Sequence, residues 1–357
     1  MSTTFGGRAA SVRFDRVTKA FGDFVAVDSV SFEVDAGSLA TLLGPSGCGK
    51  TTTLRMIAGL ELSTAGRIWI GEHDVTGLPA TRRDVSMVFQ SYALFPHMTV
   101  MENVAYGFTV SGTPKAEARE RAEQGLALVG LKGFGARLPS ELSGGQQQRV
   151  AVARALVLEP EVLLFDEPLS NLDAKLRRRV REEIRDIQRS LGLTVVYVTH
   201  DQEEALAVSD KVIVMRNAAI AQEGTPRELY EQPADRFVAD FIGDANLVEA
   251  EIRSVDGDLA RVSIGGVEVR VPGRGLPVGR VLAAIRPEAV LLEGQGGGGL
   301  AGTVRKAAYL GKHLEYTVDS PVGELFVIDR RIDDPRPAGA GVAIRFGDRI
   351  ALVPDAD

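Results

Sequence analysis

The sequence is poor in the features that mark secreted, membrane-spanning and nucleic-acid-binding proteins. Its single cysteine, Cys48, excludes an internal disulfide framework and fits a reducing cytosol. No stretch approaches the roughly 18 consecutive apolar residues that a membrane-spanning helix requires, and residues 1–10 lack the apolar core of a secretory signal. The formal net charge of -7 gives no general attraction to polyanions. We therefore expect any membrane association to go through a partner, and we expect no nucleic-acid partner.

The composition that remains is that of an ordinary globular protein with room for two domains. Hydrophobic residues make up 45% and charged residues 25% of the 357 residues, close to globular averages, and this length exceeds one average domain. Near Asn246 the pattern changes to short alternating apolar segments separated by glycine and proline, which is typical of a small all-β domain. We expect an α/β domain at residues 10–243 and the all-β domain at residues 244–357.

Apolar runs predict the sheet of the first domain. Residues 12–34 alternate in two runs broken at residues 19–23, which predicts two strands of an antiparallel margin. The strand signal fades between Asn103 and Leu158, where helical runs start at Thr113 and after Ser143, so we expect a helical subdomain at about residues 91–160. Four runs without alternation are typical of strands buried on both faces of a parallel sheet: Leu39–Leu43, Val162–Phe165, Val195–Val198 and Val212–Met215.

A charged stretch, Asp173–Leu191, separates two of these predicted strands and has helical character. Its basic residues are mixed with Glu182, Glu183 and Asp186, at spacings that permit pairing four residues apart. We interpret the stretch as a solvated helix face rather than a nucleic-acid patch. The basic residues are Arg177, Arg178, Arg179, Arg181, Arg185 and Arg189.

The strongest local pattern is a glycine-rich loop between a predicted buried strand and a predicted helix. The loop matches G-x-x-x-x-G-K-[ST], in which backbone N–H groups surround phosphate oxygens and the following helix adds its positive dipole end. Lys50 is expected to contact the β and γ phosphates, Thr51 to complete the coordination of Mg²⁺, and Thr52 to assist. The alternative is a glycine-rich turn that matches by chance. The loop reads Gly44, Pro45, Ser46, Gly47, Cys48, Gly49, Lys50 and Thr51.

Two further predicted strands end in polar residues that suit hydrolysis. Asp166 and Glu167 follow one apolar run, so a magnesium ligand and a general base can sit together at the carboxyl edge of the sheet. We expect Asp166 to hold Mg²⁺ through water and Glu167 to orient and deprotonate the attacking water. His200 follows another strand on the same edge, within reach of a γ phosphate. The alternatives are a strand cap for the carboxylates and a structural histidine.

The segment Leu142–Gln146 begins a predicted helix with a serine and two glycines. Its free N–H groups, with the helix dipole behind them, make a second anion site. A chain with two such sites needs either two ligands or a second copy that shares one. The alternative is a simple helix cap by Ser143.

Together these motifs resemble the nucleotide-binding subunit of ABC transporters, over roughly the first 240 residues. The signature from Leu142 to Arg149 is the most specific of them. The resemblance implies a P-loop NTPase core that uses ATP and Mg²⁺ and works as a head-to-tail dimer. In that dimer, ATP lies between the phosphate loop of one copy and the signature of the other, which consists of Ser143, Gly144, Gly145 and Gln146.

The resemblance also implies roles for residues outside these motifs. Phe21 matches the aromatic residue that stacks on adenine, Gln90 the residue that touches Mg²⁺ and the water, and His200 the sensor of the γ phosphate. Asn171 and Asp173 lie in the loop that crosses to the partner site. The surface that grips a membrane subunit is implied for residues 91–96, Ser91-Tyr92-Ala93-Leu94-Phe95-Pro96.

The segment after Asp244 resembles the OB-like β-barrel regulatory domain of importer ATPases for polyamines, ferric iron, phosphonates, sulfate and sugars. Residues 285–288, Ile-Arg-Pro-Glu, are a recurrent sequence motif of that domain. Residues 309–313 resemble the polyamine, iron and phosphonate branch of these importers more than the maltose branch. This resemblance implies permease subunits and a periplasmic or extracellular solute-binding protein as partners, with the chain peripheral on the cytoplasmic face of the cell membrane. Three rivals stay open: a sugar or sulfate importer, a soluble ABC ATPase in DNA repair or translation, and a phosphoryl-transferring kinase.

Overall fold

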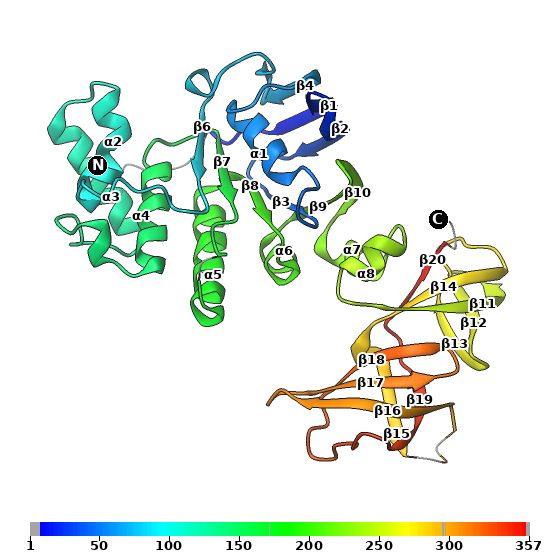
Figure 1. The fold of residues 1–357 in the computed structure, drawn as a ribbon. Helices are drawn as coiled ribbons and strands as arrows, with labels where there is room; N and C mark the ends of the chain where they lie inside the picture. Colours follow the sequence, from blue (N-terminus) through cyan, green and yellow to red (C-terminus); the bar gives the residue numbers. More distant parts are fainter. Residues whose placement is uncertain (1–7, 171, 295, 297, 355–357) are drawn as a thin grey trace. The chain divides into compact units, whose positions relative to one another are not determined.

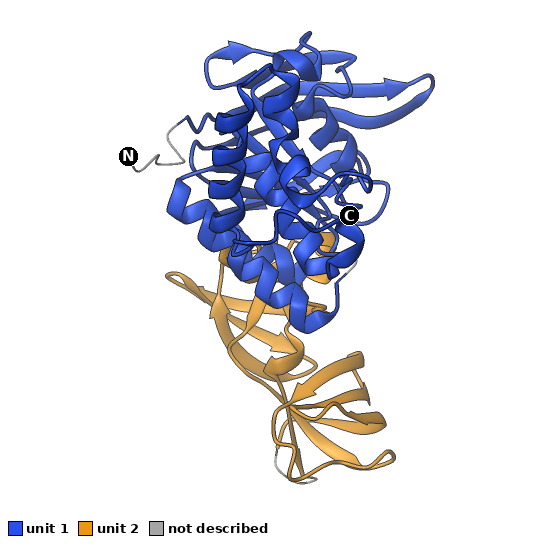
Figure 2. Cartoon of the chain, turned by 90° about the vertical axis from the view of Figure 1, so that its left-hand side faces the viewer, with its two compact units in different colours: residues 1–226 blue, residues 227–357 orange. Residues whose placement is uncertain are grey.

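The computed structural model describes residues 8–354 except residues 171, 295 and 297. The chain divides into two compact units, Met1–Pro226 and Arg227–Asp357 (Figures 1 and 2). Two short helices, α7 (Pro226–Glu231) and α8 (Arg236–Phe241), lie between this division and residue 244, where the all-β segment is expected to begin. The domain boundaries drawn from the sequence stay a prediction.

A six-stranded sheet in the order β10-β9-β3-β8-β7-β6 forms the centre of the first unit. The strands from β9 to β6 run parallel, and β10 is antiparallel to β9. The four apolar runs are confirmed as the buried strands β3, β7, β8 and β9. Helix α1 (Lys50–Ala58) packs on one face of the sheet, and helix α5 (Ala174–Leu191) packs on the other face of β3, β7 and β8. The strand bounds are β3 (Leu39–Leu43), β6 (Val85–Val88), β7 (Val162–Asp166), β8 (Thr194–Thr199), β9 (Lys211–Arg216) and β10 (Ala219–Gly224).

A four-stranded antiparallel sheet in the order β2-β1-β4-β5 forms the expected margin. Its first two strands extend further than predicted, because Ala20 pairs with Val25 and Phe21 with Phe24. Only residues 22 and 23 remain as the turn between them. The bounds are β1 (Val12–Phe21), β2 (Phe24–Val34), β4 (Ala65–Ile70) and β5 (His73–Asp74).

Three of the helices in the first unit begin at capping side chains that lie near the predicted motifs. Ser143 caps α4 in a reciprocal capping box with Gln146, while Asp173 and Asp201 cap α5 and α6. Between β6 and β7, helices α2, α3 and α4 pack on one another in the region expected to be helical (Figure 1). The helix bounds are α1 (Lys50–Ala58), α2 (Val100–Val110), α3 (Lys115–Leu128), α4 (Gly144–Leu156), α5 (Ala174–Leu191) and α6 (Gln202–Val208). Short 3-10 helices are η1 (Ala80–Arg82), η2 (Pro139–Glu141) and η3 (Pro287–Ala289).

The second unit confirms the expected all-β segment. Two five-stranded antiparallel sheets share one hydrophobic core, and α8 packs on β14 and β20. The first sheet has the order β13-β12-β11-β14-β20, with β11 (Asn246–Asp256), β12 (Leu259–Ile264), β13 (Val267–Pro272), β14 (Gly279–Ile285) and β20 (Ile350–Val353). The second has the order β15-β19-β16-β17-β18, with β15 (Val290–Gly294), β16 (Leu300–Tyr309), β17 (Leu314–Ser320), β18 (Gly323–Asp329) and β19 (Gly341–Phe346).

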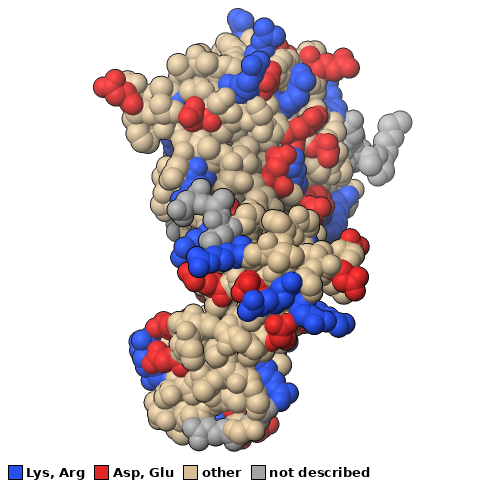
Figure 3. Space-filling view, turned by 90° about the vertical axis from the view of Figure 1, so that its right-hand side faces the viewer, with Lys and Arg blue, Asp and Glu red and all other residues tan. Residues whose placement is uncertain are grey.

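The surface and the helices show how the chain meets its surroundings. On the face shown in Figure 3, Lys and Arg side chains are interspersed with Asp and Glu. Within the part of the chain that the structure describes, no helix is both long enough and apolar enough to cross a membrane.

Candidate functional site

The glycine-rich loop passes too close to neighbouring strands to carry side chains at two of its glycines. Gly49, at φ 103°, would place a Cβ 2.4 Å from the carbonyl oxygen of Ala26 in β2. At Gly44, a Cβ would lie 2.3 Å from the carbonyl oxygen of Met215 in β9. The loop between β3 and α1 therefore keeps its shape only with glycine at these two positions.

Lys50 turns its ammonium group into this loop. Its Nζ donates to the carbonyl oxygens of Gly44 at 2.7 Å and Pro45 at 2.9 Å, and the residue is only 5% exposed. No side chain caps the start of α1 at Gly49, so the N-terminal N–H groups and the positive dipole end face the loop. The loop thus combines a fixed cation with oriented backbone donors, the arrangement that binds phosphate.

Asp166, at the end of β7, lies beside the start of α1. Thr51 Oγ1 donates to Asp166 Oδ1 at 3.4 Å. Burial is the main cause that raises the pKa of the Asp166 carboxyl; Arg55 opposes this rise and Glu167 adds to it. A hydroxyl and a half-buried carboxylate are hard donors of the kind that Mg²⁺ accepts, and a cation here would offset the partial burial of the carboxylate.

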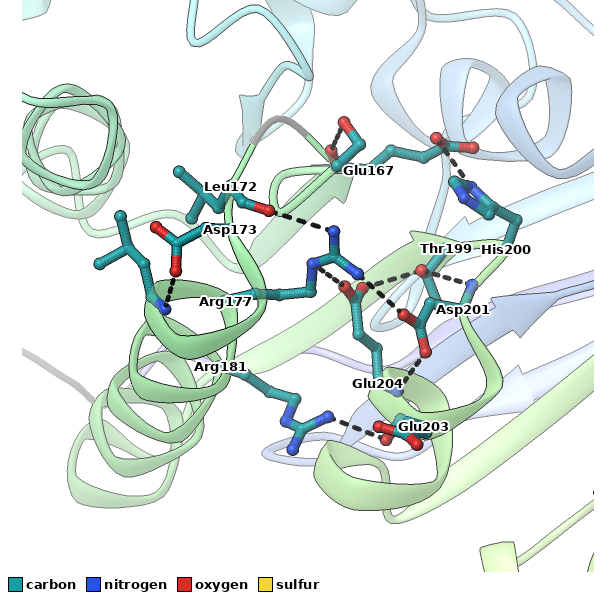
Figure 4. Close-up of polar contacts among 12 residues, drawn as sticks. Glu167, Leu172, Asp173, Arg177, Arg181, Thr199, His200, Asp201, Glu203 and Glu204 are labelled. Carbon is teal, nitrogen blue, oxygen red and sulfur yellow. Dashed lines mark hydrogen bonds and ion pairs between the residues drawn. The ribbon is translucent and has the colours of Figure 1, made fainter. Parts of the chain in front are cut away.

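Glu167 and His200 meet at the carboxyl edge of the sheet. Asp166 pairs with Val198 in the parallel ladder, so the residues that follow β7 and β8 emerge side by side. His200 Nδ1 and Glu167 Oε2 are 3.1 Å apart (Figure 4). Glu167 has φ 43°, in the left-handed region that non-glycine residues rarely adopt and that occurs at functional sites. The predicted general base and the predicted sensor of the γ phosphate are thus in contact.

Gln90 joins the same cluster from the loop after β6, whereas Phe21 lies on the antiparallel sheet. Gln90 Nε2 donates to Ser170 Oγ at 3.1 Å, and Ser170 Oγ donates to the carbonyl of Glu167 at 3.1 Å. Phe21 is 47% exposed at the end of β1, with the ammonium of Lys19 4.5 Å from its ring centroid. The ring is half-exposed and the ammonium of Lys19 lies over one of its faces, so stacking on adenine stays a prediction for the other face.

The signature segment lies apart from the phosphate loop, with α4 beside α2 and α3 in Figure 1 rather than beside α1. Ser143 and Gly144 are exposed. Ser143 N donates to Gln146 Oε1 at 2.9 Å, and Gln146 N donates to Ser143 Oγ at 3.4 Å. The hydroxyl therefore caps its own helix, as the simpler interpretation proposed, and remains at the surface.

The start of α5 packs directly against this signature. A Cβ on Gly145 would lie 3.0 Å from Leu176 Cδ1, and one on Gly144 would lie 3.4 Å from Leu172 Cδ2. Asp173 Oδ1 accepts from Leu176 N at 2.9 Å and so caps α5. The other predicted loop residue, Asn171, lies outside the described residues. The structure thus brings the signature and the predicted dimer loop together.

The arginines of α5 differ in part from the expected solvated face. Arg178, Arg179 and Arg189 are exposed as expected, but three arginines one helical turn apart are half-buried and bond to other elements rather than to residues four apart. Arg181 Nη1 donates to the carbonyl of Glu203, and Arg185 pairs with Asp210. The third, Arg177, reaches Asp201 and Glu204 (Figure 4). Because these three arginines are spaced four residues apart, they lie on one side of α5, and this spacing is the signal in the sequence that could have grouped them.

Glu204 is the buried centre of the polar network that Arg177 joins, and this network was not predicted from the sequence. It is 3% exposed, and its Oε2 accepts from Thr199 Oγ1 at 2.8 Å and from the hydroxyl of Tyr197 at 3.1 Å. Burial raises the pKa of Glu204, while Thr199, Tyr197 and Arg177 oppose the rise. Burial likewise raises the pKa of Tyr197, with Glu204 adding to the shift. The turn that carries His200 therefore rests on a buried polar network.

This fold and this loop define a P-loop ATPase of the ABC type, and the comparisons agree. Residues 27–170 match the ABC transporter family, and residues 283–357 match the TOBE domain. The Fe(3+) ions import ATP-binding protein FbpC of Brucella abortus (strain 2308) is 61% identical over 342 residues, 96% of this chain and 97% of that protein. The spermidine/putrescine import ATP-binding protein PotA of Rubrobacter xylanophilus is 47% identical over 355 residues, 98% and 93% of the two chains. The chain belongs to the ABC transporter family, as an ATP-binding subunit of an importer and a transport ATPase.

Solved structures match the ATPase fold. One is the dimeric structure of an ATP-binding cassette in a post-hydrolysis state bound to ADP and Pi, 32% identical with a TM-score of 0.54, covering 60% of this chain and 99% of that one. Another is cbiO1 from Clostridium perfringens, part of an ABC transporter complex, 26% identical with a TM-score of 0.57, covering 62% and 90%. The predicted α/β fold class with a C-terminal all-β domain is confirmed.

Proposed function

We propose that this chain is the ATP-hydrolysing subunit of an importer for ferric iron. The observation that carries the proposal is that 61% identity to an Fe(3+) import protein extends over 96% of the chain, and therefore over the C-terminal unit as well as the ATPase. The 47% identity to a spermidine/putrescine import protein makes polyamines the second candidate.

In this proposal the phosphate loop and the carboxyl edge of the sheet bind one ATP. Lys50 and the start of α1 hold the phosphates, and Phe21 stacks on the adenine. Thr51, Asp166 and Gln90 would hold Mg²⁺, which neutralises phosphate charge when bound. Lys50 and the loop keep the triphosphate fixed while the water approaches. The remaining loop residues, Pro45, Ser46, Gly47, Cys48 and Thr52, shape or extend the cradle.

Glu167 is the proposed general base. Its carboxylate takes a proton from the attacking water, and His200, 3.1 Å away, contacts the γ phosphate and keeps the carboxylate in place. Gln90 is held to the same loop through Ser170 and orients the water. All three groups come from loops that follow parallel strands, which is where a ligand binds in such sheets.

A second copy of the chain is proposed to complete the site. Its Ser143, Gly144, Gly145 and Gln146 would contact the γ phosphate, and Asn171 and Asp173 would lie in the loop that crosses between the copies. The exposure of Ser143 and Gly144 supports this arrangement, as does the dimeric, ADP- and Pi-bound state of a related cassette.

Replacing Ser143 with arginine tests the shared site. Ser143→Arg should abolish steady-state phosphate release. ATP binding, measured by equilibrium titration, should stay within about twofold, because each ATP keeps the phosphate loop of its own chain and loses only the signature of the other. Ser140→Arg, at an exposed serine three residues earlier, is the matched control and should hydrolyse ATP normally. Turnover that survives Ser143→Arg would rule the shared site out.

The membrane partners are proposed to be permease subunits, reached through residues 91–96, at the cytoplasmic face of the cell membrane. Arg154 fixes this segment, because its Nη1 donates to the carbonyl of Ala93 at 2.8 Å and its Nη2 to that of Tyr92 at 3.0 Å. Tyr92 and Ala93 both have positive φ. The Tyr92 side chain is buried in the core, so the exposed part of the segment consists of Ser91, Ala93 and Pro96. A separate solute-binding protein would deliver the solute through the complex.

Measurements of solute uptake by the native cell would identify the transported solute. Cells that lack this chain should lose import of radiolabelled ferric iron, and the wild-type chain should restore it whereas Lys50→Ala should not. Import of radiolabelled spermidine should stay unchanged. Retained iron import with lost spermidine import would transfer the assignment to polyamines.

A further inference from the structure

Arg177 lies where three parts of the nucleotide-binding unit meet: the loop before α5, the turn after β8 and helix α6 (Figure 4). Its Nη2 donates to the carbonyl of Leu172 at 3.1 Å, and its Nη1 donates to Oδ2 of Asp201 at 3.2 Å. Its Nε lies 3.7 Å from Oε1 of Glu204. The guanidinium meets a different partner with each nitrogen, in the fixed directions of its planar fork.

On one side, these partners hold the turn that carries His200. The carboxylate of Asp201, the residue after His200, accepts from Glu204 N at 3.1 Å and so begins α6. Thr199, the residue before His200, donates from Oγ1 to Glu204 at 2.8 Å and accepts from Asp201 N at 3.0 Å. Both neighbours of His200 therefore belong to the network that Arg177 binds.

On the other side, Arg177 holds the segment that packs on the signature. The carbonyl it binds belongs to Leu172, whose side chain lies against Gly144. Leu176, the residue before Arg177, lies against Gly145 at a spacing that leaves no room for a Cβ without displacement. These contacts join the signature to the segment 172–176, and through the carbonyl of Leu172 to the guanidinium.

We propose that Arg177 is a positioning residue that couples the two ATP sites of the dimer. The proposal rests on the shared site described above, in which the signature serves the partner's nucleotide and His200 serves the chain's own. A nucleotide bound against Ser143 sets the segment 172–176, Arg177 transmits that position to Asp201, and His200 is brought to its place beside Glu167. Hydrolysis at one site is thereby made to depend on occupancy of the other.

Removing the guanidinium tests the coupling. Arg177→Met should lower kcat for ATP about 10- to 100-fold by misplacing His200, with KM and nucleotide affinity within about twofold. ATP-dependent dimerisation in a Glu167→Gln background, followed by gel filtration, should be retained, because the loss comes after closure. Arg181→Met is the matched control: Arg181 also links α5 to α6, through the carbonyl of Glu203 at 3.2 Å, yet touches neither loop. Its kcat should stay at the wild-type value.

A second variant separates positioning from folding. Arg177→Met leaves the buried Glu204 without its cation, so Tm should also fall. Arg177→Met/Glu204→Gln removes that charge, while the amide oxygen still accepts from Thr199. We expect Tm to recover and kcat to stay at least about 10-fold low. Recovery of kcat together with Tm would overturn the proposal and leave Arg177 a structural residue; if the single variant does not fold, the double variant alone decides.

His200→Ala distinguishes failure of this proposal from failure of the site itself. If His200→Ala abolishes hydrolysis while the Arg177 double variant hydrolyses ATP as the wild type does, only the coupling is wrong. If His200→Ala leaves hydrolysis unchanged, the proposed site is wrong as well. Neither readout depends on which solute is imported.

Discussion

Lys50 of the nucleotide-binding unit and Arg286 of the C-terminal unit are both buried cations, but the carbonyls that they bind belong to different kinds of structure. In the nucleotide-binding unit, Lys50 is 5% exposed and donates to carbonyls of a loop whose shape suits phosphate. In the C-terminal unit, Arg286 is 2% exposed and donates to carbonyls of Tyr230, Ala239 and Ile242, near the ends of α7 and α8, with its guanidinium over the Tyr230 ring. A cation saturated by helix ends fixes the fold. A cation in a phosphate-shaped loop can bind a ligand, so burial alone does not distinguish the two roles.

The largest effect should come from the general base of the first unit. Glu167→Gln keeps the shape of the side chain but cannot accept the proton, so ATP hydrolysis should fall about 10²- to 10⁴-fold while ATP binding is preserved. A phosphate-release assay and gel filtration of the ATP-bound dimer measure both. Glu288→Gln, at the glutamate of the second unit that accepts from Tyr230, is the control and should leave turnover intact. Undiminished hydrolysis in Glu167→Gln would refute the base assignment.

Glycines with positive φ offer the next contrast between the units. Gly49→Ala would drive a Cβ into the carbonyl of Ala26, so the loop must shift and ATP affinity should fall roughly 100-fold. Gly311→Ala, at φ 81° in the hairpin between β16 and β17, meets open space and should cost only about 1 kcal/mol of stability. Titration with ATP and thermal melts test the pair. Equal ATP affinity in both variants would contradict the steric argument.

Arg286→Met tests the structural cation. The carbonyls of Tyr230, Ala239 and Ile242 would lose their buried donor, so the C-terminal unit should lose about 3 kcal/mol or more of unfolding free energy. Chemical denaturation should show this loss, whereas kcat of the ATPase should stay unchanged. Arg349→Met, at an exposed arginine that pairs with Glu288, is the matched control with a change below about 1 kcal/mol. A fall in kcat for Arg286→Met alone would give this residue a functional role.

The smallest effect should be at the proposed adenine stack. Phe21→Ala removes a half-exposed ring, so ATP affinity should fall by about 1 kcal/mol, roughly fivefold. The loss should be similar for GTP, because any base offers a π face. Phe24→Ala, across the same turn and more exposed at 63%, should leave affinity unchanged. An equal loss in both variants would place the nucleotide elsewhere.

The sequence predicted those parts of the site in which a motif directly follows a strand. The runs before Asp166 and His200 predicted parallel neighbours, and the ladder between Asp166 and Val198 explains why Glu167 and His200 meet. The end of β1 was placed too early, because cross-strand pairing carries the strand on to Phe21 where local alternation had stopped.

The network around Arg177 could not be predicted in the same way. Its partners Asp201 and Glu204 lie more than twenty residues away, and a helix rich in arginine and glutamate has the same composition whether its charges face water or another helix. Tertiary packing decided which arginines turned inward. Only their four-residue spacing carried information, and that spacing also fits surface pairing.

The left-handed backbone of Glu167 has a consequence for how this chain can change. At φ 43° a glutamate is held in a conformation that costs of order 1 kcal/mol or more, whereas asparagine adopts it more readily. A library of variants selected for heat resistance alone would therefore favour asparagine at this position and discard the proposed base. Heat resistance and ATP hydrolysis therefore favour different residues at position 167, and glutamate is retained there only under selection for turnover.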